Sequence, residues 1–510
     1  MNDSKFTPVL VAVGQVTDKD YHSPPIEIIA QACQSAAQDS GRADLLSTIQ
    51  DIAMTGLTVD APQAKTPISR GFKNPPKSLA IQLGMEPKRL FYSGPGGNTP
   101  QYMVNRFASE IARGKTDSVL LAGGESLATM LKKFDRWYKW LFSTSDWKDN
   151  PGGEPELLGS YRDANTRYEE NHGLDLPSVV YPLFENALRA HYGHSVKDHQ
   201  QKIGELFSRL THVAADNPLA WFQQARTADE LTTAGEDNRM VNFPYTKRLN
   251  SMIMVNQAAA VVIMSTEKAA KLGIPQDQWV YLHGHADAND IWNVSERVDF
   301  HSSPAIRHCG QQALAMAGIS INEVKHFDIY SCFPSAVQIA CDELGIAPSS
   351  NVELSLTGGL PYFGGPGNTY SLHGIAHMAD RLRANPGEFG LVNANGWYLT
   401  KHSLGIYSTN PAVNKSYEMS PIEEMASEQK VKTTENPSGK GVIETYTVSF
   451  DKSGAPSKGI IIGRDENGQR FLANTRSDTS MLNEICEKDG AIGRSGTIAR
   501  KGKLNLFTLD

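Results

Sequence analysis

The chain has 510 residues, of which 40% are hydrophobic and 21% are charged, a composition typical of globular proteins. Its 49 Lys+Arg and 56 Asp+Glu give a net charge of -7, which argues against a main role in coating nucleic acid or an anionic membrane. No run of about 18 apolar residues predicts a membrane span, and no secretory signal is recognisable. The five cysteines are widely spaced, so we expect a reducing, cytoplasmic location.

The first elements predict an α/β protein. Residues 8–13 form a short apolar run typical of a buried strand, and a helix follows between Pro25 and Gly41. Further along, residues 90–92 predict a strand, residues 100–113 a helix and residues 118–122 another strand. Strands that alternate with helices in this way are typical of parallel strands joined by crossover helices.

A glycine-rich turn occurs twice, which indicates two homologous halves. Residues 92–99 read Tyr-Ser-Gly-Pro-Gly-Gly-Asn-Thr, and residues 362–369 read Tyr-Phe-Gly-Gly-Pro-Gly-Asn-Thr. Each turn leads into a predicted helix, ending near Arg113 or Arg383, and then into an apolar strand. The shared order of turn, helix and strand makes a duplication a better explanation than a chance match of glycines.

Residues 127–250 separate the two halves and contain four of the seven tryptophans, including Trp137 and Trp140. We interpret them as an inserted, mostly helical subdomain that either covers an active site or is only structural.

The last part of the chain predicts a small β-barrel after a polar linker at 427–440. Val442, Tyr446, Val448 and Phe450 alternate as one face of a strand, and residues 451–455 form a predicted turn. Asn467-Gly468 predicts a hairpin with a type I′ turn. Because exposed aromatic residues do not alternate with Lys and Arg here, we expect the barrel to pack on the main body rather than bind oligonucleotides.

Four segments in a fixed order resemble the thiolase superfamily over about residues 8–408. They are residues 110–126, 192–220, 258–269 and 358–366. The pattern is most similar to type 1 thiolase-like proteins of the sterol-carrier-protein branch, which carry an additional C-terminal β domain.

The resemblance implies a duplicated five-layer αβαβα thiolase fold with an inserted helical loop domain and a C-terminal OB-like β-barrel. The implied domains are an N-terminal half (1–126 and 251–270), a loop domain (127–250), a C-terminal half (271–416), and a linker with the barrel (417–510).

The positions where thiolases carry their catalytic groups hold other residues here. Thiolase chemistry needs a cysteine thiolate at a helix N-terminus, an activating imidazole and a second cysteine as acid and base. The resemblance places the nucleophile at Gly97, or at Gly96 if the register shifts by one. The imidazole motif reads Gly364-Gly365-Pro366, and the second cysteine aligns with residues 393–396, Asn-Ala-Asn-Gly. We therefore expect no classical thiolase activity.

The glycine turns remain candidates for ligand binding. Free N–H groups at a helix N-terminus, together with the helix dipole, can hold a thioester carbonyl, a carboxylate or a phosphate. The alternative is that these turns only connect a strand to a helix. The expected binding residues are Gly96, Gly97, Asn98, Gly365 and Asn395.

Four residues are candidates for catalysis, each with a structural alternative. Cys332 is either a replacement nucleophile or a buried apolar residue, and Tyr330 either donates to a carbonyl oxygen or belongs to the core. His373 and His402 are either general bases or packing residues. No group of His, Cys, Asp and Glu has the spacing of metal ligands, so no metal is expected.

The sequence thus predicts a thiolase-like protein that binds acyl-CoA, either as an acyltransferase without a cysteine-linked intermediate or as a binder without turnover. A third hypothesis is an interaction subunit that completes another thiolase. Coenzyme A is expected as a substrate or ligand rather than as a permanently bound cofactor, and the protein as a monomer or homodimer without a nucleic-acid partner.

Overall fold

The computed structural model describes residues 4–60, 71–134, 139, 146–347, 352–412, 416–487 and 490–510. Trp137 and Trp140 lie outside these residues. Within the described part of the chain, no helix is both long and apolar enough to cross a membrane.

A ten-stranded mixed sheet forms the body of the molecule, in the order β10-β11-β12-β9-β1-β8-β4-β2-β3-β5. Its strands are β1 (Pro8–Thr17), β2 (Asp51–Met54), β3 (Arg89–Ser93), β4 (Ser118–Ser126), β5 (Glu156–Leu158), β8 (Asn256–Ser265), β9 (Val280–Asn289), β10 (Val324–Ile329), β11 (Phe389–Gly396) and β12 (Lys401–Ser408). The two halves of the sheet join where Val9 and Leu10 of β1 pair with Tyr281 and Val280 of β9.

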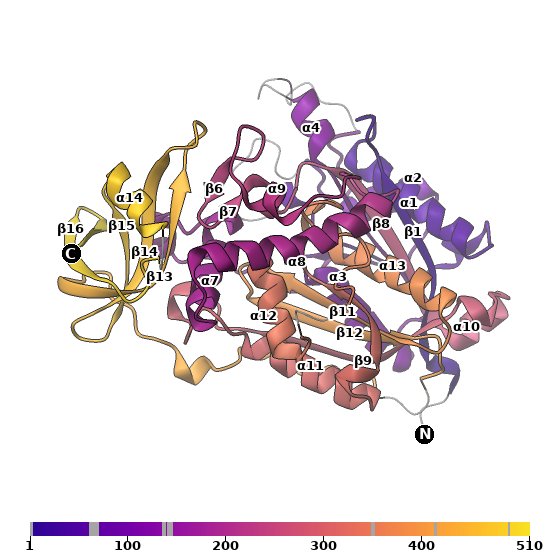
Figure 1. Ribbon diagram of the computed structural model, residues 1–510. Helices are drawn as coiled ribbons and strands as arrows, with labels where there is room; N and C mark the ends of the chain where they lie inside the picture. Colours follow the sequence, from indigo (N-terminus) through magenta and orange to yellow (C-terminus); the bar gives the residue numbers. More distant parts are fainter. Residues whose placement is uncertain are drawn as a thin grey trace.

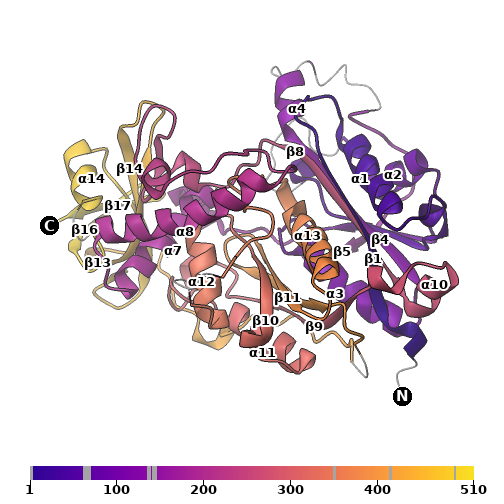
Figure 2. The same cartoon turned by 45° about the vertical axis from the view of Figure 1, so that its right-hand side comes forward.

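Helices cover the sheet in three layers (Figures 1 and 2). The helices of the body are α1 (Pro25–Asp39), α2 (Pro75–Leu83), α3 (Thr99–Ala112), α10 (Thr266–Lys271), α11 (Pro304–Ala317), α12 (Pro334–Leu344) and α13 (Tyr370–Ala384). α3 and α13 pack between the two halves of the sheet, while α1 and α2 cover the outer face of one half and α11 and α12 that of the other. Neighbouring residues of a buried strand therefore enter different cores: Val261 of β8 faces α3 and α13, and Val262 faces α1. This is the predicted αβαβα arrangement.

The two halves repeat each other in detail. β1 followed by α1 corresponds to β9 followed by α11, and α3 followed by β4 corresponds to α13 followed by β11. A Cβ atom at Gly14 of β1 would lie 2.1 Å from the carbonyl oxygen of Ala32, and one at Gly284 of β9 would lie 2.0 Å from that of Ala313. The same close approach of strand to helix excludes a side chain in both halves, which supports the duplication inferred from the glycine turns.

The insertion between the halves is mostly helical. It contains α4 (Leu127–Lys133), α6 (Arg167–His172), α7 (Pro177–His191), α8 (Val196–Asp216) and α9 (Ala228–Thr232), with the short strands β6 (Met240–Asn242) and β7 (Tyr245–Thr246). β5 also belongs to the insertion and pairs in parallel with β3, so that it covers that edge of the sheet. α7 buries one face on the C-terminal half and contacts the C-terminal domain, where Thr445 Oγ1 donates to the carbonyl oxygen of Leu183 (2.6 Å).

The C-terminal domain is a closed five-stranded barrel, seen in yellow at the left of Figure 1. Its strands are β13 (Gly439–Phe450), β14 (Pro456–Asp465), β15 (Arg470–Thr475), β16 (Ser495–Lys501) and β17 (Leu504–Leu509), with α14 (Thr479–Ile485) packed on them. The fully buried Arg470 fastens the barrel to the body, because its guanidinium donates to the carbonyl oxygens of Ser295 (3.2 Å) and Arg297.

Two local predictions in the barrel are wrong. Val442 is 44% exposed, and Ile443 beside it is only 2% exposed, because a bulge between Ile443 and Thr445 reverses the alternation before Tyr446. The hairpin at Asn467 is present, but its turn is not type I′. Gly468 has a φ of 73°, whereas Asn467 does not have the positive φ that a type I′ turn requires at both central residues.

Candidate functional site

The two glycine turns meet at the N-terminus of α3. The backbone N–H of Gly96 donates to Oδ1 of Asn368 (2.7 Å), whose Nδ2 donates to the carbonyl oxygen of Gly56 (2.7 Å). Ser371, in the first turn of α13, donates to the carbonyl oxygen of Gly97 (2.5 Å). The duplicated turns therefore hold each other in place at the N-terminus of α3, the positive end of its dipole.

Tyr330 occupies the place where a side chain at Gly97 would lie. A Cβ at Gly97 would be 2.0 Å from the Tyr330 hydroxyl oxygen and 2.7 Å from the carbonyl oxygen of Asn395. Tyr330 follows β10 directly, and its ring contacts Tyr370 edge-on with centroids 5.5 Å apart. Burial raises the pKa of Tyr330 well above its usual value, so the phenol stays protonated and can donate a hydrogen bond.

Lys401 fills the corresponding space beside Gly96. A Cβ at Gly96 would lie 2.7 Å from Nζ of Lys401, which donates to the carbonyl oxygen of Pro95. The side chain is 5% exposed, and burial lowers its pKa to about 7. The sequence interpretation did not single out Lys401 as a site residue. The residues around Lys401 gave little signal, because Thr400, His402 and Ser403 beside it are also polar and a lysine among polar residues is usually exposed.

Asn395 and Cys332 lie on the other side of the turn, next to Tyr181 of the insertion. Nδ2 of Asn395 donates to the Tyr181 hydroxyl (2.8 Å) and lies 3.9 Å from Sγ of Cys332. Burial raises the pKa of Cys332 to about 12, so its sulfur is a neutral thiol near pH 7, and the geometry favours the packing interpretation.

Tyr181 also holds the loop that joins β11 to β12. Its hydroxyl accepts from the N–H of Leu399 (3.2 Å) and donates to the carbonyl oxygen of Trp397 (3.1 Å). Both loop residues have positive φ, 57° at Trp397 and 54° at Leu399. Non-glycine residues adopt positive φ only where neighbouring contacts hold the backbone in place. The hydroxyl of Tyr181 provides such contacts, so the insertion helps to shape the site.

Two buried acceptors in the site have no hydrogen-bond donor in the described part of the chain. They are the side-chain oxygens Oδ1 of Asn98 and Oδ1 of Asn395. The nitrogen of each amide is bound, that of Asn98 to Ser403 (3.2 Å), so each oxygen is left for another partner. Because unsatisfied buried acceptors are costly, these atoms indicate a ligand or water that donates hydrogen bonds.

The remaining predicted residues lie outside this group. His373 is fully buried against Gln15, with Nδ1 2.8 Å from Oε1, and burial lowers its pKa to about 3. His402 follows Lys401 in β12 and points to the opposite face of the sheet, where its Nε2 lies 3.2 Å from Oδ2 of Asp290. Gly365 donates to the carbonyl oxygen of Met252 (2.8 Å), just after the insertion. The structure therefore brings Gly96, Gly97, Asn98, Tyr330, Cys332 and Asn395 together.

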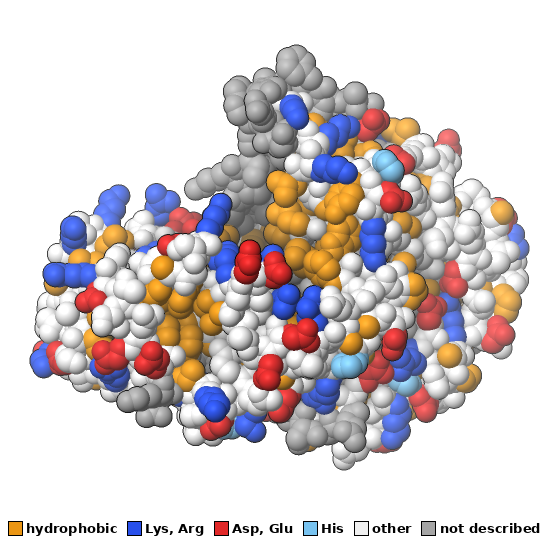
Figure 3. All heavy atoms as spheres, turned by 45° about the horizontal axis from the view of Figure 1, so that its top comes forward, with side chains coloured by type: hydrophobic (Ala, Val, Ile, Leu, Met, Phe, Trp, Pro, Cys, Tyr) orange, Lys and Arg blue, Asp and Glu red, His pale blue; other side chains and the backbone are white. Residues whose placement is uncertain are grey.

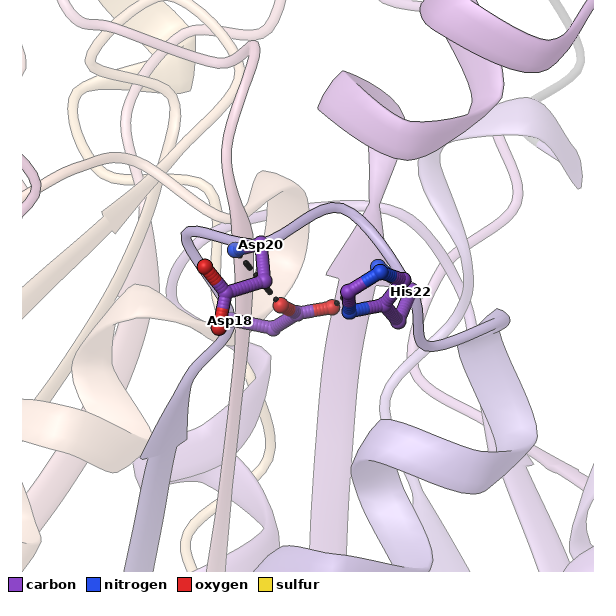
Figure 4. A group of neighbouring side chains, drawn as sticks. All are labelled: Asp18, Asp20 and His22. Carbon is purple, nitrogen blue, oxygen red and sulfur yellow. Dashed lines mark hydrogen bonds between the residues drawn. The ribbon is translucent and has the colours of Figure 1, made fainter.

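One group of side chains has the composition of a metal site, although its sequence spacing did not suggest one. Asp18, Asp20 and His22 place their ligand atoms within 4.8 Å of one another on a surface loop (Figure 4). Oδ1 of Asp18 accepts the backbone N–H of Asp20, and Oδ2 accepts those of His22 and Ser23. The Asp18 carboxylate therefore closes the turn, and this contact explains the cluster.

Comparisons with known proteins agree on the family. Residues 286–369 match a family profile described as "Thiolase C-terminal domain-like", and residues 421–503 match "Thiolase-like protein type 1 additional C-terminal domain". Among curated proteins, no sequence matches the chain.

Solved structures, in contrast to the curated sequences, match the chain over most or all of its length. A monomeric SCP2-thiolase like protein type 1 from Mycobacterium smegmatis is 36% identical, with 100% of both chains covered and a TM-score of 0.81. The Ltp2-ChsH2(DUF35) aldolase is 16% identical over 81% of this chain and 100% of that chain, with a TM-score of 0.59. Human mitochondrial 3-ketoacyl-CoA thiolase is 14% identical over 79% of this chain and 99% of that chain, with a TM-score of 0.55. The last two support the thiolase fold alone. The first, at 36% identity over the whole of both chains, shows that the chain belongs to the type 1 SCP2-thiolase-like proteins.

Proposed function

We propose that the protein binds acyl-CoA thioesters at the N-terminus of α3 and does not form a cysteine-linked acyl intermediate. The helix dipole between the paired glycine turns favours the partial negative charge of a thioester carbonyl. The unsatisfied Oδ1 atoms of Asn98 and Asn395 suit the amide N–H groups of a pantetheine arm. Together they provide complementary partners for the thioester carbonyl and for the amide N–H groups of the pantetheine arm.

The observation that carries the proposal is the contact between Gly97 and Tyr330. Because the Tyr330 hydroxyl lies 2.0 Å from an ideal Cβ at Gly97, the helix N-terminus has no room for a nucleophilic side chain in this arrangement. The nearest thiol, Cys332, stays protonated near pH 7 since burial raises its pKa to about 12. Both features argue against a cysteine-linked acyl intermediate at this helix N-terminus.

A transferase or hydrolase that avoids a cysteine adduct is the second candidate. Lys401 favours it, because burial lowers the pKa of the amine to about 7 and leaves a neutral fraction that can accept a proton beside the thioester. We further propose that the protein is a monomer, like its relative from Mycobacterium smegmatis. The cytoplasmic location stays a prediction.

Titration calorimetry with coenzyme A, acetyl-CoA and longer acyl-CoA esters tests the binding. Asn395→Ala should weaken binding roughly three- to tenfold, the effect of one net hydrogen bond. Asn410→Ala, an exposed asparagine beyond the far end of β12, is the matched control and should leave the affinity unchanged. The absence of saturable binding by any ester would refute the proposal.

The release of free coenzyme A from the same esters separates the two candidates. A binder gives no release above the rate without protein, whereas a transferase or hydrolase gives release that Lys401→Met abolishes. Cleavage of acetoacetyl-CoA that persists in Cys332→Ser would contradict the absence of thiolase chemistry.

A further inference from the structure

Apolar side chains gather near the centre of one face of the molecule, with Lys and Arg side chains around them (Figure 3). Five large apolar residues on neighbouring segments are between 37% and 59% exposed, and the half-buried Trp221 lies among them. We call these six residues the apolar patch: Tyr21, Leu131, Trp221, Phe222, Ile253 and Met254. Single exposed apolar residues are common, whereas a contiguous group of them indicates a binding surface.

The segments that carry the apolar patch meet where β1 ends and β8 begins. The hydroxyl of Thr17 donates to the carbonyl oxygen of Leu219 (2.6 Å), and Nε2 of Gln257 donates to the same oxygen (3.2 Å). The N–H of Ala128 in α4 donates to the carbonyl oxygen of Val255 (3.4 Å). The loop after β1, the start of α4, the segment after α8 and the segment before β8 are therefore held together by hydrogen bonds.

Contacts of the patch residues themselves join these segments into one surface. The ring of Tyr21 contacts that of Trp221 edge-on, with centroids 6.0 Å apart. The N–H groups of Phe222 and Met252 donate to carbonyl oxygens of the segment 360–362 (2.9 and 3.2 Å). The apolar patch is thus contiguous, and it borders the start of the second glycine turn.

Three exposed lysines border the apolar patch: Lys19, Lys132 and Lys133. Nζ of Lys19 donates to Oε1 of Gln223 (3.1 Å), and Nζ of Lys132 lies 4.6 Å from the centroid of the Tyr21 ring. Nζ of Lys133 lies 5.2 Å from the centroid of the Trp147 ring. These partners are neutral, so the contacts leave the three positive charges uncompensated while the apolar stems of the lysines extend the patch.

Two aspartates in the loop of Tyr21 offset this charge only in part. The carboxylate of Asp18 is already used within the loop, where it accepts the N–H groups of Asp20 (2.9 Å), His22 (2.9 Å) and Ser23 (2.8 Å). Asp20 is exposed. Because the lysines outnumber the aspartates, the surface favours an anionic partner over a cationic one.

We propose that the apolar patch binds the surface of a lipid bilayer that contains anionic lipids. Tyr21, Trp221 and Phe222 enter the headgroup region, where rings with an apolar body and a polar edge are most favourable. The neighbouring aliphatic side chains reach the start of the acyl chains, and the lysines contact the lipid phosphates.

This contact is peripheral, and it does not depend on the thioester proposed above. A second copy of the chain is a less suitable occupant of the apolar patch, because the relative from Mycobacterium smegmatis is described as monomeric. A bilayer needs no matching shape, only apolar side chains with positive charge beside them, and both are present here.

Sedimentation of the full-length protein with lipid vesicles tests the binding. One set of vesicles contains phosphatidylcholine and anionic phosphatidylglycerol in equal parts, and the other contains phosphatidylcholine alone. We expect saturable binding to the mixed vesicles that weakens with added salt, and binding to the neutral vesicles that is at least about threefold weaker.

Variants separate the apolar and the charged contributions. Phe222→Ser and Ile253→Ser each remove apolar surface and should lower the partition coefficient roughly fivefold. Val442→Ser is the matched control, because Val442 on the barrel and Ile253 are both 44% exposed. Lys132→Glu should weaken binding to the mixed vesicles roughly tenfold, whereas Lys115→Glu, just beyond the far end of α3, should change it by less than about twofold.

Unchanged melting temperatures show that the variants are folded. Three results would overturn the proposal: no binding to the mixed vesicles, equal binding to the neutral ones, or an unchanged partition coefficient in both serine variants of the apolar patch. Light scattering that finds a dimer in solution, dissociated by Phe222→Ser, would assign the patch to a second copy of the chain and refute the binding of lipid.

Discussion

Replacing Gly97 by alanine should destabilise the protein through a clash with Tyr330. The new Cβ would lie 2.0 Å from the hydroxyl oxygen, while ordinary contact begins at 3.4 Å, so the phenol must withdraw by about 1.4 Å. Tyr330 is buried against Tyr370 and has little room to move. Such overpacking costs about 1–3 kcal/mol, against a gain of about 0.4–1 kcal/mol from replacing glycine in the unfolded chain.

Gly235→Ala is the matched control, because a Cβ there meets nothing within 4 Å and neither glycine has a positive φ. Thermal unfolding should show a lower melting temperature for Gly97→Ala and an unchanged or slightly higher one for Gly235→Ala. In a Tyr330→Ala background the Gly97→Ala penalty should disappear, with a coupling energy of at least about 1 kcal/mol. Equal melting temperatures of the two alanine variants, or additivity with Tyr330→Ala, would refute the reasoning.

Two further predictions concern buried ionisable groups. Burial lowers the pKa of Lys401 to about 7, so the unfolded chain binds more protons between pH 7 and about pH 10.4 and stability rises with pH in this window. The melting temperature of the wild type relative to Lys401→Met should therefore increase from pH 7 to pH 9, and a constant difference would contradict the burial of a titrating amine. Since burial raises the pKa of both Cys332 and Cys486 to about 12, access decides which thiol iodoacetamide reaches at pH 8: the buried Cys332 should stay unlabelled in the native protein while the less buried Cys486 reacts slowly. Mass spectrometry that finds Cys332 alkylated first would contradict the buried, protonated thiol.

The fold was predictable because its signals are local and repeated. The two glycine turns each start a helix, and the predicted strand at 118–122 and helix at 100–113 correspond to β4 and α3 within a few residues. The barrel was predictable as a set of short strands. The bulge after Ile443 was not, because it depends on how β13 pairs with β14 rather than on the sequence of β13 itself.

The site was predictable only where a single segment determines it. Gly96, Gly97 and Asn98 lie in one turn, so their placement followed from that turn. Lys401 comes from β12, and its position beside Gly96 depends on the packing of the two halves. Alternation along a strand requires that Lys401 and His402 face opposite ways, but it does not say which one meets the glycine turn.

β5 also bears on how the protein behaves among its own copies. Its three residues, Glu156–Leu158, pair with Phe91, Tyr92 and Ser93 and take up backbone groups that another chain could otherwise join by adding a strand. A strand so short offers few groups on its outer side, and Glu156 brings a charge to that border. β5, a small part of the insertion, therefore covers the β3 edge of the ten-stranded sheet. We expect this edge not to pair with a strand from a second copy of the chain.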